Sequence, residues 1–105
     1  MFYRLYTGED GQSHMDESYE PPEVQDATSI VVRKQEVGYF IDWHPAPRKQ
    51  YIITLAGNVE IGLGDGTVYT LGPGDMMLAE DLTGQGHTTK AVGTETRVSV
   101  ALTLD

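Results

Sequence analysis

The amino-acid sequence predicts an all-β domain with the architecture of a sandwich or barrel. Short segments rich in β-branched and aromatic residues follow one another from residue 28 onward, at the spacing of roughly 8–12 residues that is typical of such folds. Turn-forming sequences separate these segments, and the chain contains 12 glycines and 5 prolines. No stretch of about 12 residues keeps the i, i+3, i+4 apolar spacing of an amphipathic helix, so we expect almost no helix.

Each predicted strand is bounded by residues that favour a turn. After a first strand near the N-terminus, the predicted strands are residues 28–33, 39–43, 51–55, 59–63, 67–71, 76–79 and 97–104. The turns between them include Gly57-Asn58, residues 64–66, residues 72–75 and residues 84–86. Glycine and asparagine accept positive φ and proline presets φ, so these short sequences can reverse the chain direction.

The last predicted strand, residues 97–104, alternates between two kinds of side chain. Its larger apolar residues share one face and its small residues share the other; the two sets are Val98, Val100, Leu102 and Leu104, and Ser99, Ala101 and Thr103. This pattern is typical of an antiparallel strand that is buried on one face. The small residues either line a cavity or face solvent, and we expect them to face solvent.

Length, composition and charge exclude several classes of protein. A chain of 105 residues suits one compact domain. Without cysteine it contains no disulfide, thiol nucleophile or cysteine-ligated metal centre. Sixteen acidic residues against seven Lys and Arg give a net charge of −9, which disfavours nucleic-acid binding. The apolar runs are far shorter than the roughly 20 residues that span a bilayer. The first ten residues resemble no signal peptide, so we expect a cytoplasmic protein that binds no membrane.

The negative charge is concentrated near the N-terminus. Residues 9–26 contain seven acidic residues, no Lys or Arg, and the pair Pro21-Pro22. This composition predicts a long surface loop or arm, and the alternative is a lid over a site. We therefore divide the single domain into an N-terminal strand with an acidic arm, residues 1–27, and a β-barrel, residues 28–105.

Histidine is the residue type in this chain best suited to proton transfer near neutral pH. The three histidines are His14, His44 and His87. Strict alternation along residues 39–44 places Phe40, Asp42 and His44 on one face, and His87 shares a face with Thr89. A single histidine on a strand is usually structural, so a functional site requires His44 and His87 to converge from separate strands.

The spacing of residues around His44 resembles the first motif of the cupin superfamily, G-x5-H-x-H-x3,4-E-x6-G. The corresponding residues are Gly38, His44, Ala46, Gln50 and Gly57. Residues 72–75, a short strand and His87 resemble the second motif, so the similarity covers residues 38–87, about half of the chain. The resemblance implies a cupin-like double-stranded β-helix, a jelly-roll barrel, with a site in the barrel mouth.

The resemblance also implies a metal site, which this sequence completes only in part. His44 and His87 stand at ligand positions, but Ala46 and Gln50 replace a histidine and the glutamate. The loss of the carboxylate should lower affinity for iron or manganese. His14 from the arm can replace the ligand lost at Ala46, and Asp42 can supply the charge. The metal set is then His14, His44, Gln50 and His87, which suits a divalent transition metal (Fe, Mn, Zn, Ni or Cu).

A metal-free pocket is the alternative, with His44 and His87 as catalytic acid and base. Such a pair suits isomerisation, dehydration or cyclisation of a small molecule. Gln50 and Thr89 would orient the substrate, and Trp43 would contact it from the aromatic cluster beside His44. Arg48 lies at the rim of the barrel in the geometry that the resemblance implies. It would receive an anionic group of the substrate or pair with the acidic arm.

Two classes of function follow from these residues. The first is an enzyme of oxygenase, isomerase or lyase type that acts on a small organic molecule, with or without a metal. The second is a non-catalytic module that binds a small molecule or metal for sensing. We expect the partners to be this small molecule and a second copy of the chain, because small jelly rolls expose sheet edges and apolar faces that a homodimer covers.

Overall fold

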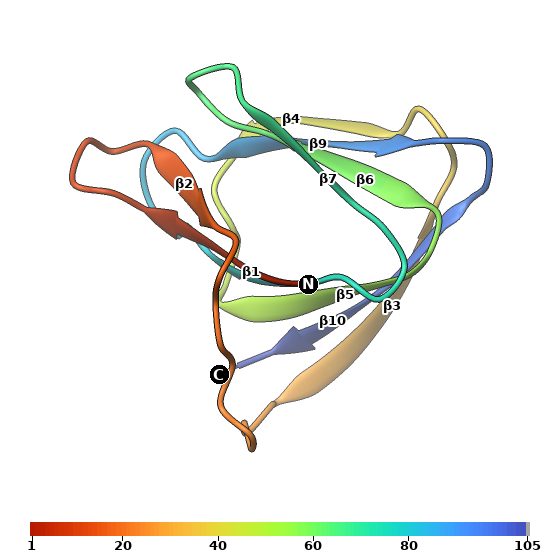
Figure 1. Ribbon diagram of the computed structural model, residues 1–105, viewed down its shortest axis with the longest axis horizontal. Coiled ribbons are helices and arrows are strands. Elements are labelled where there is room, and N and C mark those ends of the chain that lie inside the picture. Colours follow the sequence, from red (N-terminus) through yellow and green to blue (C-terminus); the bar gives the residue numbers. More distant parts are fainter. Residues whose placement is uncertain (105) are drawn as a thin grey trace.

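The computed structural model describes residues 1–104, which form two β-sheets that face each other (Figure 1). The strands are β1 (Phe2–Thr7), β2 (Ser13–Asp16), β3 (Ser29–Gln35), β4 (Phe40–His44), β5 (Gln50–Ala56), β6 (Asn58–Gly62), β7 (Val68–Leu71), β8 (Met76–Glu80), β9 (His87–Val92) and β10 (Arg97–Thr103). The predicted all-β class is confirmed. Over these residues, no helix is long and apolar enough to cross a membrane.

The sheets are built from strands that are distant in sequence. The larger sheet has the order β2-β1-β8-β5-β10-β3, and the smaller has the order β4-β9-β6-β7. β1 runs parallel to β8, and the other paired neighbours are antiparallel. Because the chain crosses repeatedly between the two sheets from β3 onward, residues distant in the sequence line the space between them.

The N-terminal residues belong to the barrel. β1 pairs with β8 inside the larger sheet, and Leu5 is completely buried. β2 forms within the acidic segment, where the sequence predicted a loop. It forms because Ser13 and Met15 alternate toward the interior: Ser13 bonds to buried Asp81, and Met15 packs against the core. Residues 8–12 and 17–28 lie outside the strands, and none of residues 9–26 lines the cavity described below.

The expectation that the small residues of β10 face solvent is wrong. Ser99, Ala101 and Thr103 are buried between the sheets, while Val98, Val100 and Leu102 lie half-buried on the outer face. The sequence pattern could not distinguish these faces because both faces of the larger sheet contain apolar side chains. Small residues on the inward face leave room for a cavity between the two sheets.

A β-bulge in β4 corrects the predicted alternation of that strand. Ile41 lies opposite Thr89 and His44 lies opposite His87, so three steps along β4 match two along β9. Because of the extra residue, side chains after the bulge point to the opposite side of the sheet from the side that strict alternation predicts. His44 therefore shares the inward face with Ile41, and Phe40 lies exposed on the outside.

Candidate functional site

A cavity of about 190 Å³ lies between the two sheets. Polar side chains stand at two parts of its wall, and apolar side chains of Ile41, Ile52, Ile61 and Met77 lie among them. The first polar group is His44, Gln50, His87 and Thr89, and the second is Arg33, Gln35, Arg97 and Ser99. Among the described residues, none that lines this cavity is acidic.

His87 is oriented by a buried carboxylate. Asp81 is fully buried, and its Oδ2 accepts hydrogen bonds from Ser13 Oγ and from His87 Nδ1, both at 2.6 Å. A carboxylate only accepts hydrogen bonds, so Nδ1 of His87 holds the proton. The other ring nitrogen, Nε2, is then free to take a proton from a molecule in the cavity.

His44 stands beside His87 with the same ring nitrogen engaged. Its Nδ1 donates to the main-chain carbonyl oxygen of Asp42 over 2.7 Å, which leaves Nε2 free as in His87. The centroids of the two imidazole rings are 4.5 Å apart, and the ring planes are inclined by 53°. Two unblocked imidazole nitrogens can therefore reach the same small molecule.

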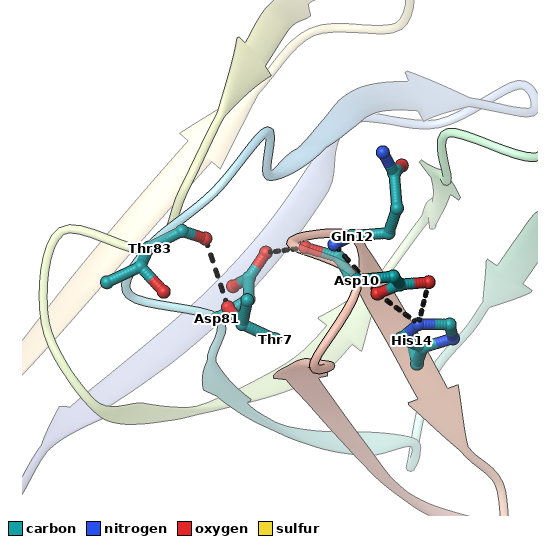
Figure 2. Close-up of polar contacts among 7 residues, drawn as sticks. Thr7, Asp10, Gln12, His14, Asp81 and Thr83 are labelled. Atoms are coloured by element: carbon teal, nitrogen blue, oxygen red, sulfur yellow. Dashed lines mark hydrogen bonds and ion pairs between the residues drawn. The ribbon is translucent and has the colours of Figure 1, made fainter.

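The segment between β8 and β9 brings these two rings together. Asp81 begins it, and its main-chain oxygen accepts a hydrogen bond from Ala46 N at 2.9 Å. Thr7 Oγ1 donates to the carbonyl oxygen of Thr83 at 3.0 Å (Figure 2). Gly86 has φ +79°, and a Cβ there would collide with main-chain atoms of His44 and Pro45. Glycine at this position thus permits the close approach of β9 to the end of β4.

The cavity contains some of the predicted substrate-binding residues and lacks others. Gln50 and Thr89 line it beside the histidines. Trp43 and Arg48 do not line it, and both side chains are exposed. Trp43 lies in the bulged part of β4, where alternation fails, and Arg48 lies in the loop before β5.

His14 lies apart from the two cavity histidines. Its Nε2 contacts both carboxylate oxygens of Asp10, at 3.0 and 3.1 Å (Figure 2), and it does not line the cavity. Asp42, the other predicted substitute ligand, is exposed and also does not line it.

The donors in the cavity do not fit the metal site that the resemblance implied. In residues 1–104, no group of three or more His, Asp or Glu side chains could hold a metal ion. Two imidazoles and the neutral amide of Gln50 lack the anionic ligand that ferrous iron sites use.

Sequence reasoning missed Arg97 and the partner of His87, Asp81. Arg97 is 6% exposed; its two terminal nitrogens donate to Gln35 Oε1 at 3.1 Å and to Thr54 Oγ1 at 3.2 Å. Burial lowers the pKa of its guanidinium. Alternation could have placed Arg97 on the face of Ser99 and Ala101, but those residues were expected to face solvent.

Comparisons with known proteins identify the fold. No family model and no curated protein matches the sequence. A conserved protein with a double-stranded β-helix domain from Klebsiella pneumoniae has 23% identity and a TM-score of 0.58, over 81% of each chain. An RmlC-like cupin protein from Desulfovibrio desulfuricans has 18% identity and a TM-score of 0.52, over 96% of this chain and 79% of that one.

An enzyme–substrate complex has a similar structure. The structure of FeII HppE in complex with its substrate has 17% identity and a TM-score of 0.52, over 80% of this chain and 55% of that one. Identities in this range establish the fold alone. The chain is a double-stranded β-helix, so the jelly-roll barrel implied by the motif spacing is confirmed.

Proposed function

We propose that this chain, which has the cupin fold, is an enzyme that transfers protons on a small organic molecule held in the cavity. One observation carries this proposal: the buried Asp81 carboxylate orients His87, and the His87 ring stands 4.5 Å from the ring of His44 on the same cavity wall. A buried carboxylate that holds a histidine in one tautomer and orientation is the support that the general base of a catalytic triad receives.

The two histidines have complementary roles in this proposal. His87 Nε2 removes a proton from a carbon atom next to a carbonyl group, and the negative charge of Asp81 stabilises the imidazolium that forms. Protonated His44 donates its proton to a second carbon of the substrate, or to a leaving hydroxyl group that departs as water. Proton exchange between the neighbouring rings through solvent then restores both histidines. The reaction is an isomerisation in the first case and a dehydration in the second.

Gln50 and Thr89 orient the reacting end of the substrate. Both line the cavity together with the histidines, and Gln50 is 8% exposed. An amide and a hydroxyl group can each hold a carbonyl or hydroxyl oxygen of the substrate by a hydrogen bond. Holding the substrate in one orientation lowers the barrier to proton transfer because the reacting atoms are already in place.

The test of this proposal is turnover of a bacterial metabolite extract followed by liquid chromatography coupled to mass spectrometry, because isomers have equal mass and must be separated. With the wild type and the control His14→Gln, one metabolite should be replaced by an isomer or by a product that lacks one water. His87→Gln should slow this reaction about 10²–10⁴-fold, the usual contribution of a general base. Equal turnover by His87→Gln contradicts the proposal. Depletion of a metabolite by binding, without a product, supports the non-catalytic module instead.

Metal analysis tests whether this chemistry runs without a resident metal. Elemental mass spectrometry of the protein as isolated should find far less than one equivalent of any transition metal. Near one equivalent that is lost in both His44→Ala and His87→Ala would contradict the metal-free route. It would assign the two imidazoles to metal binding, the class of site that the motif resemblance implied.

A further inference from the structure

Arg97 is a buried cation that has no anionic partner among residues 1–104. Its residue is 6% exposed, and no Asp or Glu of residues 1–104 lies within 4.0 Å of its guanidinium. Gln35 and Thr54 each accept one hydrogen bond from it, and its Nε has no hydrogen-bond partner. Burying a charge that is paired only with neutral groups is costly. The cavity beside Arg97 is the place where an anion can offset this cost.

The charge of the cavity wall is opposite to that of the whole chain. The chain has a net charge of −9, yet the charged side chains lining the cavity are Arg33 and Arg97, with no described acidic residue beside them. Arg33 lies opposite Ser99 on the neighbouring strand, and it forms none of the ion pairs found in residues 1–104. A positive cavity in an acidic protein selects an anionic ligand.

The cationic and the histidine ends of the cavity are separated along the larger sheet. Arg97 begins β10, whereas Gln50 lies opposite Thr103 at the other end of that strand. Gln50 also lies opposite Ala79, two residues before the Asp81 that holds His87. Apolar side chains, among them Ile52, Ile61 and Met77, also line the cavity. The wall thus offers a cation, an apolar surface and a proton-transfer pair.

We infer that the ligand of this cavity is a small monocarboxylic acid whose carboxylate binds Arg97, with Arg33 beside it. A planar carboxylate matches the fork of N–H groups on a guanidinium. The volume of about 190 Å³ is below the range of about 300–1,000 Å³ for drug-sized ligands, so the apolar body of the acid is short. The position of its reactive end beside His44 and His87 rests on the proposed function.

A purely structural role for Arg97 makes different predictions. In that case Arg97 only ties β3 and β5 to β10 through Gln35 and Thr54. Substituting it would then lower stability without changing any preference for acids over amides. The comparison of an acid with its own amide therefore separates the two roles, because the pair differs in charge and hardly in shape.

The experiment is to titrate the protein with two acids, butanoate and benzoate, and separately with their amides, butanamide and benzamide. Binding is measured by calorimetry and, for the wild type, also by NMR. Each acid should bind at least about tenfold tighter than its amide, a difference of about 1.4 kcal/mol. Arg97→Met should abolish this preference and leave amide binding unchanged. The control Arg48→Met, an exposed arginine outside the cavity, should keep it.

Three results would overturn the inference. They are equal binding of acid and amide by the wild type, no saturable binding of either acid up to tens of millimolar, and tight binding of inorganic phosphate with no binding of the acids. If Arg97→Met does not fold, Arg97→Lys keeps the charge but loses the fork, and it should weaken acid binding more than amide binding. If the wild type instead turns over a neutral metabolite at a rate that Arg97→Met does not change, that result would overturn this inference while the proposed function stands.

Discussion

At the scale of single residues, the candidate site depends on one buried carboxylate. Asp81 accepts hydrogen bonds from Ser13 of the larger sheet and from His87 of the smaller sheet, and no other described acidic residue is as completely buried. The negative charge of Asp81 favours the His87 tautomer that carries its proton on Nδ1. The reactivity assigned to Nε2 of His87 is therefore set by a residue that never contacts the ligand cavity.

The substitution Asp81→Asn tests this dependence. The amide keeps the shape but loses the charge and part of the accepting capacity, so the free energy of unfolding should fall by about 1–3 kcal/mol. Long-range ¹H–¹⁵N NMR should show that Nδ1 of His87 is the protonated nitrogen in the wild type, and that this preference weakens in Asp81→Asn. The control is Asp26→Asn in the exposed arm. An unchanged stability and an unchanged His87 spectrum would contradict the assignment.

Alkaline titration tests the packing of Tyr51. Burial, the hydrogen bond to Tyr19 and the charge of Glu80 raise the pKa of Tyr51 from 10.0 to about 12. Because the folded state keeps this proton to higher pH than the unfolded state, the free energy of unfolding should fall as pH rises from 10 to 12. Phenolate absorbance should show a late step that is missing in Tyr51→Phe and retained in Tyr39→Phe. If Tyr51→Phe instead removed a phenolate titration step near pH 10, the pKa of Tyr51 would not be raised, and the prediction would be contradicted.

At the scale of strands, the site depends on irregular features more than on regular ones. Alternation predicted most strands correctly. It failed at β4, since the bulge that turns His44 inward has no signal in a two-residue period. Two strands were not among those predicted: β2, which consists of four residues within an acidic segment, and β9. The bulge lies in the pairing of β4 with β9, and β2 is held by the hydrogen bond from Ser13 to Asp81, so both depend on residues distant in the sequence.

Two glycine substitutions test the close approach of β9 to β4. Gly86 and Gly66 both have positive φ, at +79° and +90°, so alanine is strained at either position by about 1–2 kcal/mol. A Cβ at Gly66 meets nothing within 4 Å, whereas a Cβ at Gly86 meets the main chain of His44 and Pro45. In urea unfolding, Gly86→Ala should therefore lose clearly more stability than Gly66→Ala. Equal losses would contradict this account of the loop.

At the scale of the whole molecule, the outer face of the larger sheet is the surface that we expect a second copy to cover. β3 is an edge strand, and its outward residues Ile30 and Val32 are 65% and 62% exposed. They lie opposite Leu102 and Val100 of β10. An exposed edge with an apolar face favours association.

Light scattering at micromolar concentration tests the expected homodimer. The wild type should have twice the chain mass of 11.6 kDa, and Val32→Lys should shift it toward the monomer because a charge would enter an apolar interface. Val24→Lys, in the arm outside the sheets, is the matched control and should remain dimeric. A monomeric wild type would contradict the expectation.

The sequence predicted the fold better than the site for a physical reason. Alternation and turn residues are local, and the motif spacing led to His44, Gln50 and His87. The partners that define their surroundings are not local: Ser13 lies 68 residues from Asp81, and Gln35 and Thr54 lie 62 and 43 residues from Arg97. Only the assembled sheets show that Arg97 faces a cavity and that His14 does not.

If His44 and His87 face a ligand site between the sheets, a bound ligand should affect these two of the chain's three histidines and leave His14 unaffected. The most direct measurement is NMR of the three imidazole rings during titration with benzoate. The signals of His44 and His87 should shift together and saturate, while those of His14 stay constant. Constant signals for all three rings, or a shift of His14 alone, would contradict it.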